Sequence, residues 1–146
     1  MRTKILHDKL GKIPLVIAEV GQNHQGSLKI AKEYIREFSK CGADIIKFQA
    51  RNNKRLFSKE AYNKIYDSEN SFGKTYGQHR EKLELSFNDL RELKKECKKR
   101  NLLFMVTPFD ETSLKLVSKL NVDIIKIASF DLGNLPFINL ISKEKK

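Results

Sequence analysis

The stretch Asp44-Ile45-Ile46-Lys47-Phe48-Gln49-Ala50 returns later in the chain as Asp123-Ile124-Ile125-Lys126-Ile127-Ala128-Ser129. Each copy is a short β-branched run, which predicts a β-strand. Because side chains alternate between the two faces of a strand, Lys47 and Gln49 share one face. The apolar neighbours predict strands covered on both faces, as in a parallel sheet. An ammonium group there is costly unless an anion meets it, so we expect both lysines to bind an anionic substrate.

A structural network is the alternative for these lysines, with Lys47 and Lys126 paired to Glu19 and Asp131. The matching positions of the lysines on two strands favour the binding role. Two ammonium groups in one pocket suit a substrate with two anionic groups. Glu19 lies in an apolar run of its own, so it is either an ion-pair partner or a general acid or base.

Length and composition indicate one globular domain. The chain has 146 residues, 40% hydrophobic and 32% charged, which is enough for a single core. No apolar run has the length of a membrane span, and the N-terminus lacks the core of a signal peptide, so we expect a cytoplasmic protein with no membrane partner. Cys41 and Cys97 have no metal-binding spacing and are expected to be buried thiols.

The formal net charge of +11 raises the question of a nucleic-acid partner. The excess is mostly lysine spread along expected helix faces and at the C-terminal end, without an aromatic RNA-binding strand or a zinc-finger spacing. We therefore expect a solvated basic surface and no nucleic acid. A basic field would also favour a small acidic substrate.

Strands and helices alternate along the sequence. Hydrophobic patterns predict strands over 15–20, 44–49, 102–106 and 123–127, and helices that begin at the N-caps Ser27 and Ser86. A third helix ends at Asn121, and a last helical turn begins near Pro136. Residues 51–85 form an excursion with one short helix over 58–66, which is either a binding lid or disordered. His79 within it is expected at the surface.

This order predicts an α/β fold with parallel βα units. An open doubly wound sheet is one closure, but no GxGxxG motif follows the first strand. The other closure is a TIM (β/α)8 barrel, in which functional groups gather at the carboxyl ends of the strands. Polar residues lie at the ends of all four expected strands, which favours the barrel. A complete barrel has about 250 residues, so the chain is expected to form its N-terminal half.

Several polar side chains near these strand ends have two interpretations. Asn23 and His24 either line the site or build a turn. Thr107 offers a hydroxyl to a phosphate or caps the next helix, and Ser129 and Asp131 have the same two roles open to them. No Ser/His/Asp or Cys/His constellation is present, and no metal-ligand spacing is complete.

Five segments of the chain resemble the sialic acid synthase (N-acetylneuraminate synthase) family, in the family's order and approximate spacing. The segments are 17–26 (IAEVGQNHQG), 42–49 (GADIIKFQ), 76–84 (YGQHREKLE), 107–110 (TPFD) and 126–132 (KIASFDL). The resemblance implies that residues 1–146 are part of a TIM-barrel catalytic domain. It also implies that the second half-barrel and a C-terminal antifreeze-like domain are absent from this chain.

The resemblance implies a carbon–carbon bond-forming transferase of carbohydrate biosynthesis. Such enzymes condense phosphoenolpyruvate with an open-chain N-acetylhexosamine, such as N-acetylmannosamine, to give a nonulosonic acid. Carbon 3 of phosphoenolpyruvate attacks the aldehyde, water adds at carbon 2, and phosphate leaves. A divalent metal, Mn or Mg, orients the aldehyde and activates water, with ligands that are not in this chain. A homodimer is implied for the full-length protein.

Matched positions carry expected roles. The phosphoenolpyruvate pocket would comprise Lys47, Gln49, Thr107 and Ser129, with Lys126 assisting catalysis in the same pocket. Glu19 would be the catalytic carboxylate and Asp131 would act near the sugar, while Asn23 and His24 are substrate-binding candidates in the first loop.

The chain departs from the family at Phe130, where many members have glycine, so the sugar pocket is open to a different acceptor. A legionaminic or pseudaminic acid synthase is therefore the alternative within the same class. A non-catalytic half-barrel that binds an acidic metabolite or polyanion is the alternative outside it. We expect the chain alone to be inactive, because the metal site is missing. We also expect poor solubility or self-association, because its first and fourth strands would be open edges.

Overall fold

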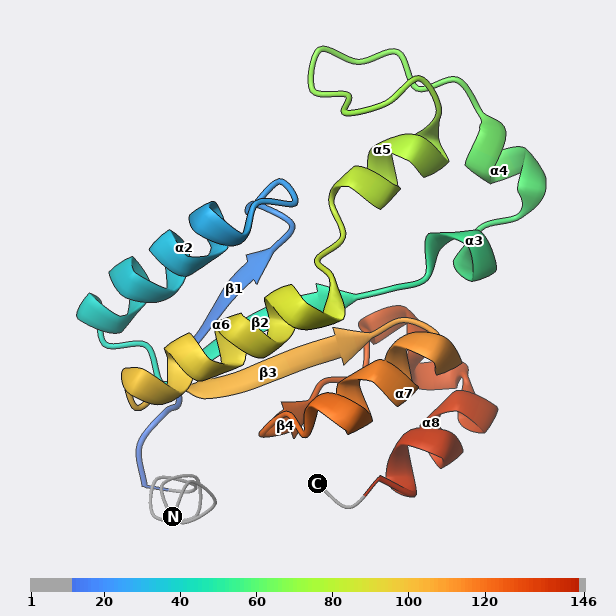
Figure 1. The fold of residues 1–146 in the computed structure, drawn as a ribbon. Helices are drawn as coiled ribbons and strands as arrows, with labels where there is room; N and C mark the ends of the chain where they lie inside the picture. The colour runs from blue at the N-terminus through green and yellow to red at the C-terminus, as the bar shows by residue number, and fades with distance from the viewer. Residues whose placement is uncertain (1–11, 145–146) are drawn as a thin grey trace.

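The computed structural model describes residues 12–144, and its centre is a parallel sheet with the strand order β1-β2-β3-β4 (Figure 1). The strands are β1 (Ile17–Gly21), β2 (Ile45–Ala50), β3 (Leu103–Pro108) and β4 (Ile124–Ile125). Each strand pairs with its neighbours in sequence, without the reversal of order that marks a doubly wound sheet. The order therefore agrees with the wall of a barrel.

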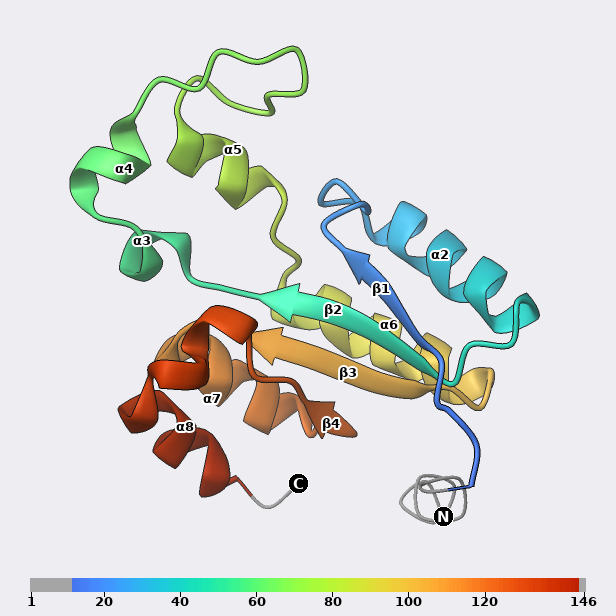
Figure 2. The ribbon, with the colours of Figure 1, turned by 180° about the vertical axis from the view of Figure 1, so that it is seen from behind.

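Three helices connect the strands and cover one face of the sheet. They are α2 (Leu28–Lys40), α6 (Phe87–Lys99) and α7 (Glu111–Leu120). Seen from behind, β2 and β3 lie in front of α6 (Figure 2). After β4 the chain forms the 3-10 helix η1 (Ser129–Gly133) and then α8 (Leu135–Ser142), which begins within a residue of the predicted Pro136.

The two faces of the sheet are buried to different extents. The main core lies between the sheet and the helices, and Phe48 and Phe104 are fully buried at its centre with ring centroids 5.5 Å apart. The opposite face carries only a small cluster of Ile45, Leu103 and Met105. Within the described residues β3 is buried along its whole length, whereas β1 and β4 are partly exposed and Lys47 and Gln49 of β2 are half-buried. The prediction of two covered faces therefore holds for β3 and not for the outer strands.

Local sequence signals set the ends of the helices as predicted. The Ser27 side chain accepts a hydrogen bond from the backbone N–H of Ile30, and Ser86 forms a capping box with Asp89. Asn121 ends α7 in the left-handed conformation. The fourth strand is shorter than predicted, because the chain turns into η1 soon after Lys126 donates its backbone N–H to Val106.

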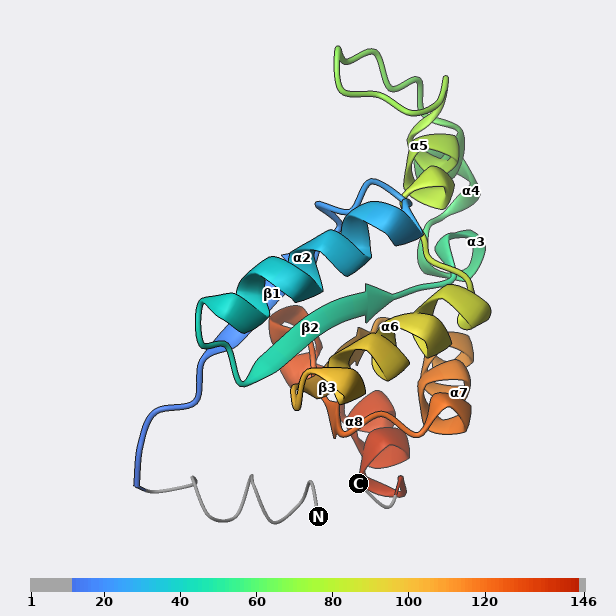
Figure 3. The ribbon, with the colours of Figure 1, turned by 60° about the vertical axis from the view of Figure 1, so that its left-hand side comes forward.

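The excursion between β2 and α6 is ordered and lies beyond the carboxyl end of β2 (Figure 3). It contains α3 (Asn53–Leu56), α4 (Lys59–Asn63) and α5 (Tyr76–Lys82), and α4 confirms the short helix predicted over 58–66. His79 is buried rather than exposed, so its predicted position is wrong. Its ring packs against Tyr66 and Phe72, and its Nδ1 accepts the N–H of Phe72 at 3.2 Å.

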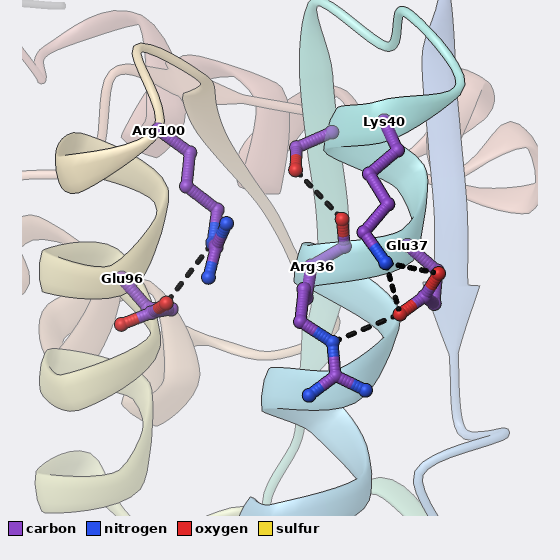
Figure 4. Close-up of polar contacts among 6 residues, drawn as sticks. Arg36, Glu37, Lys40, Glu96 and Arg100 are labelled. Carbon is purple, nitrogen blue, oxygen red and sulfur yellow. Dashed lines mark hydrogen bonds and ion pairs between the residues drawn. The ribbon is translucent and has the colours of Figure 1, made fainter.

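The basic helix surface is partly neutralised by short-range ion pairs. On α2, Glu37 pairs with Arg36 at 2.8 Å and with Lys40 at 3.0 Å, and on α6 Glu96 pairs with Arg100 at 3.0 Å (Figure 4). These contacts agree with a solvated basic surface. In the part of the chain that is described, no helix has the length and hydropathy needed to cross a membrane.

Neither cysteine forms a disulfide, and the two differ in exposure. Cys97 is buried in the helix-side core, as predicted. Cys41 is exposed, so the prediction of a buried thiol is wrong there. The reason is its position at the C-cap of α2, where the chain leaves the packed face of the helix.

Candidate active site

The open face of the sheet holds the polar side chains that the sequence places on the strands. In the parallel register Glu19 of β1 pairs with Lys47 of β2, and Gln49 of β2 pairs with Thr107 of β3. Strand alternation directs these side chains away from the helix-covered core. The neighbouring strands therefore bring an acid, an ammonium group, an amide and a hydroxyl together near the carboxyl ends of β1 to β3.

Lys47 is the central charge of this face. Its Nζ forms an ion pair with Glu19, and its side chain is only 16% exposed. Burial lowers the pKa of Lys47, and the positive charge of Lys126 lowers it further even though Glu19 lies beside it. The two lysines are thus close enough for each charge to act on the other.

One half of the alternative ion-pair network is present. Lys47 pairs with Glu19, whereas no carboxylate among residues 12–144 forms an ion pair with Lys126. The open face therefore carries two ammonium groups and one paired carboxylate. A surplus positive charge in a half-buried position is suited to an anionic ligand.

Glu19 is less buried than its apolar strand suggests. Its side chain is 42% exposed, because the face it occupies has no helical cover. The strand register shifts between Glu19 and Gly21, and Gly21 has a positive φ of 57°. A Cβ on Gly21 would lie 3.3 Å from Oε1 of Glu19 and 3.6 Å from Nε2 of Gln49, so the acid and the amide flank the same glycine.

Thr107 carries a buried hydroxyl at the end of β3. Its Oγ1 has no hydrogen-bond partner in the described structure, although the residue is only 2% exposed. Buried polar atoms are nearly always hydrogen-bonded in the functional state of a protein. The hydroxyl is therefore free to bind a ligand on the open face, beside its register partner Gln49.

The segment after β4 holds the remaining strand-end candidates. Ser129 is exposed at the start of η1. Asp131 is buried, and its Oδ1 accepts a hydrogen bond from the amide of Asn134 at 3.2 Å. Its Oδ2 has no partner among the described residues. Phe130 between them is exposed, and its ring centroid lies 5.6 Å from that of Phe109.

The two candidate residues in the loop after β1, Asn23 and His24, lie in different environments. Asn23 is exposed, whereas His24 is buried with its ring centroid 6.0 Å from that of Phe48, which belongs to the helix-side core. Nδ1 of His24 accepts the backbone N–H of Gly26 at 3.0 Å, and burial lowers its pKa. The structure therefore does not bring His24 to the open face, and its contacts are those of a residue that builds the turn.

Two buried charges lie where the strands end, at the rim of the open face, and neither was predicted from the sequence. Nε of Arg51 lies 3.6 Å from Oε1 of Glu84, which comes from the connection between α5 and α6. Burial raises the pKa of Glu84 to about 7, and the charge of Arg51 opposes that rise. The signal for Arg51 was its spacing, because residues 47, 49 and 51 follow one strand face. Glu84 gave no comparable signal.

A divalent metal does not fit the described residues. No group of three or more histidine, cysteine, aspartate and glutamate side chains comes together there in a way that could hold a metal ion. We therefore derive no step through a metal.

The fold and the open face together define a class of protein. Parallel strands in sequential order, helices on one face, and polar groups at the carboxyl ends of the strands are the features of a (β/α) barrel enzyme. Residues 34–146 match the NeuB family, so the chain belongs to that family.

Curated relatives include synthases of several nonulosonic acids. The chain is 39% identical over 129 residues to N-acetylneuraminate-9-phosphate synthase of Homo sapiens, covering 88% of this chain and 36% of the relative. It is 38% identical over 136 residues to N,N'-diacetyllegionaminic acid synthase of Campylobacter jejuni, covering 92% and 41%. The chain thus spans about two fifths of the length of these relatives.

Solved structures agree with the fold class. The N-acetylneuraminic acid synthetase of Leptospira borgpetersenii, solved in complex with citrate, superposes with a TM-score of 0.72 at 30% identity, over 93% of this chain and 46% of that one. A truncated 3-deoxy-D-arabino-heptulosonate 7-phosphate synthase of Thermotoga maritima gives a TM-score of 0.58 at 15% identity, over 94% of this chain and 42% of that one, which speaks for the fold alone. The predicted partial TIM barrel is confirmed.

Proposed function

We propose that this chain carries the phosphoenolpyruvate-binding part of a sialic acid synthase. The reaction would join phosphoenolpyruvate to an N-acetylated hexosamine and release phosphate. The observation that carries the proposal is the presence of two ammonium groups on the open face. The charge of Lys126 lowers the pKa of Lys47, and Lys126 has no carboxylate partner among the described residues. Phosphoenolpyruvate has the two anionic groups, a phosphate and a carboxylate, that such a pair would bind.

Each strand-end residue has a role that follows from its chemistry. The two ammonium groups would hold the phosphate and the carboxylate of phosphoenolpyruvate, and the unpartnered hydroxyl of Thr107 would donate to a phosphate oxygen. Ser129, exposed at the start of η1, would add a second hydroxyl. Fixing the substrate in this way reduces the entropy that the condensation must lose to reach its transition state, and so lowers the barrier.

Glu19 would act as the proton carrier of the site. Its carboxylate is paired to Lys47 when no substrate is bound. An arriving phosphate or carboxylate would compete for that ammonium group and free Glu19 to accept a proton from the water that adds at carbon 2. Asp131, with one carboxylate oxygen unpartnered, would serve the sugar side of the site.

Binding of phosphoenolpyruvate to the 146-residue chain tests the proposal. Isothermal titration should detect saturable binding that falls at least about tenfold in Lys47→Ala and in Lys126→Ala, the effect of losing one charge-assisted contact. Lys95→Ala is the matched control, because Lys95 pairs with Glu92 on the exposed surface of α6. Equal affinity in all four proteins would contradict the proposal.

The acceptor sugar needs a separate test. The relatives named for N-acetylneuraminate and for legionaminic acid are almost equally similar to this chain, and the exposed ring of Phe130 lies between Ser129 and Asp131. Phosphate release by a protein that carries the complete barrel, measured with a panel of N-acetylated hexoses that includes precursors of legionaminic and pseudaminic acids, would separate the candidates. We propose that the chain alone does not turn over, so turnover by monomeric protein would contradict that part.

Cys41 and Cys97 form no disulfide, which suits a reducing compartment such as the cytoplasm. A divalent metal and a homodimer remain proposals for the full-length enzyme. A non-catalytic half-barrel that binds an acidic metabolite or polyanion through Lys47 and Lys126 is the competing function. Salt-dependent binding of nucleic acid that survives Lys47→Ala would instead indicate an effect of the surface lysines.

A further inference from the structure

Arg51 is a buried charged residue at the rim of the open face. It lies just beyond β2, and its side chain is only 3% exposed. Its Nη2 donates a hydrogen bond to Oε1 of Gln49, and its guanidinium carbon lies 4.3 Å above the ring centroid of Phe109. The guanidinium plane is therefore fixed by a ring on one side and an amide at its edge.

Glu84 supplies the opposite charge from a distant part of the chain. Its side chain is 16% exposed, and its Oε1 lies 3.6 Å from Nε of Arg51. The same oxygen accepts a hydrogen bond from Nε2 of Gln22 at 3.2 Å. The contacts join the loop after β1, the end of β2 and the connection from α5 to α6 at one point. A buried arginine is costly unless it is paired in this way.

An amide side chain can present either its oxygen or its NH2 group to a ligand, and the two differ in what they bind. Arginine is a donor only, so Arg51 can hold Gln49 only through the amide oxygen. The NH2 group of Gln49 then lies beside Gly21, near the carboxylate of Glu19.

We propose that Arg51 is a positioning residue of the substrate site, which acts through Gln49. By holding the amide oxygen it commits the amide NH2 to the open face, where it selects a hydrogen-bond acceptor such as a carboxylate, carbonyl or hydroxyl oxygen of the substrate. Phe109 and Glu84 keep the guanidinium in the plane that this contact needs. The identity of the ligand rests on the proposed function, whereas the contact between Arg51 and Gln49 does not.

A ligand-free experiment tests the contact on the whole 146-residue chain. The side-chain amide signals of Gln49, identified in NMR spectra by their loss in Gln49→Ala, should move and lose order in Arg51→Lys, which keeps the charge but not the planar fork. Arg55→Lys is the matched control, because Arg55 is exposed on α3 and binds Thr112 instead. Unchanged Gln49 signals in Arg51→Lys would overturn the proposal, whatever the chain binds.

A double-mutant cycle then separates positioning from a purely structural role. Arg51→Lys should weaken phosphoenolpyruvate binding about tenfold in the wild-type background, and have almost no effect when Gln49 is already alanine. Glu84→Gln, which keeps an acceptor for Gln22, should weaken binding in the same direction and by a smaller factor. An equal loss from Arg51→Lys in both backgrounds would mean that Arg51 only stabilises the fold, and would overturn the proposal.

The two arms fail in different ways. If wild-type protein does not bind phosphoenolpyruvate, the proposed function fails, and the Gln49 signals still decide whether Arg51 positions that amide. If wild-type protein binds and the cycle shows no coupling, the proposed function stands and the role of Arg51 does not. Thermal unfolding of every variant checks that the compared proteins are folded.

Discussion

The two faces of the sheet are made from the same strands and have opposite characters. One face carries Phe48 and Phe104 and is sealed by helices. The other carries Lys47 and Thr107 beside a smaller apolar cluster of Ile45, Leu103 and Met105. Residues one position apart in sequence therefore belong to different physical environments. The difference teaches that stability and ligand binding can be changed separately in this chain, because strand alternation assigns them to different side chains.

The largest expected effect is on the sealed face. Phe104→Ala removes a fully buried ring and should lower the free energy of unfolding by about 3–5 kcal/mol. The next residue, Met105, lies on the opposite face in a smaller buried cluster, and Met105→Ala should cost about 2 kcal/mol because that cluster holds fewer apolar side chains. Urea denaturation followed by circular dichroism measures both. Equal losses would mean that the two faces are packed alike.

A second effect concerns the buried acid at the rim. The pKa of Glu84 is raised to about 7 in the folded chain from an ordinary value of 4.5, so folding favours the protonated form. Its contribution to stability is therefore fully present below about pH 4.5 and is lost as the pH rises to about 7. The loss is about 3 kcal/mol, and Glu84→Gln should remove this part of the pH dependence.

Glu37→Gln is the control for that pH effect. Glu37 is exposed on α2, and hydrogen bonds from Arg36 and Lys40 lower its pKa (Figure 4). Its small contribution has the opposite sign, because it is lost as the pH falls. If wild type and Glu84→Gln show parallel stability curves between pH 5 and pH 8, the rim is as well solvated as the helix surface.

A third effect tests how the rim is held together. Gly26 has a φ of 74°, and a Cβ there would lie 2.1 Å from the carbonyl oxygen of Lys82. Gly26→Ala should therefore destabilise the fold by about 2–3 kcal/mol. Gly42 also has a positive φ, but no atom lies within 4 Å of its Cβ position, so Gly42→Ala should cost only about 1 kcal/mol. Thermal unfolding measures the loss of stability in both variants. Equal losses would mean that the backbone around Gly26 is loosely packed.

The smallest stability effect belongs to the open face. Lys126→Met should change the free energy of unfolding by less than about 0.5 kcal/mol, because the lost charge also relieves repulsion of Lys47. The pKa of Lys47 should rise in this variant, as NMR titration of its side chain would report. Lys98→Met on the exposed face of α6 is the control. A large loss of stability in Lys126→Met would make that lysine part of the core.

Local patterns in the sequence were sufficient for most of the fold. The strand periodicity around Lys47 and the caps at Ser27 and Ser86 depend on residues within a few positions of one another, and the structure confirms them. The burial of His79 could not be predicted in this way, because it depends on how Tyr66 and Phe72 fold back onto α5.

The candidate site was predictable to the same extent. Strand spacing predicted Lys47, Gln49 and Thr107 at one end of the sheet. The register pairs Gln49 with Thr107, and Lys47 lies two residues before Gln49 on the same face. The contact of Arg51 with Glu84 joins residues 33 positions apart and follows no local period. Such a pair becomes visible only when the chain is folded, and it is the part of the site that the sequence did not reveal.

The sequential order of the strands has a consequence for how the chain acquires its structure. Because each strand pairs only with the strands before and after it, each strand pair joins consecutive βα units of the chain. Such a topology can grow from one end, so each βα unit can dock while the ribosome is still adding the next. The open face that carries both Lys47 and Lys126 would then be completed late, when β4 pairs with β3.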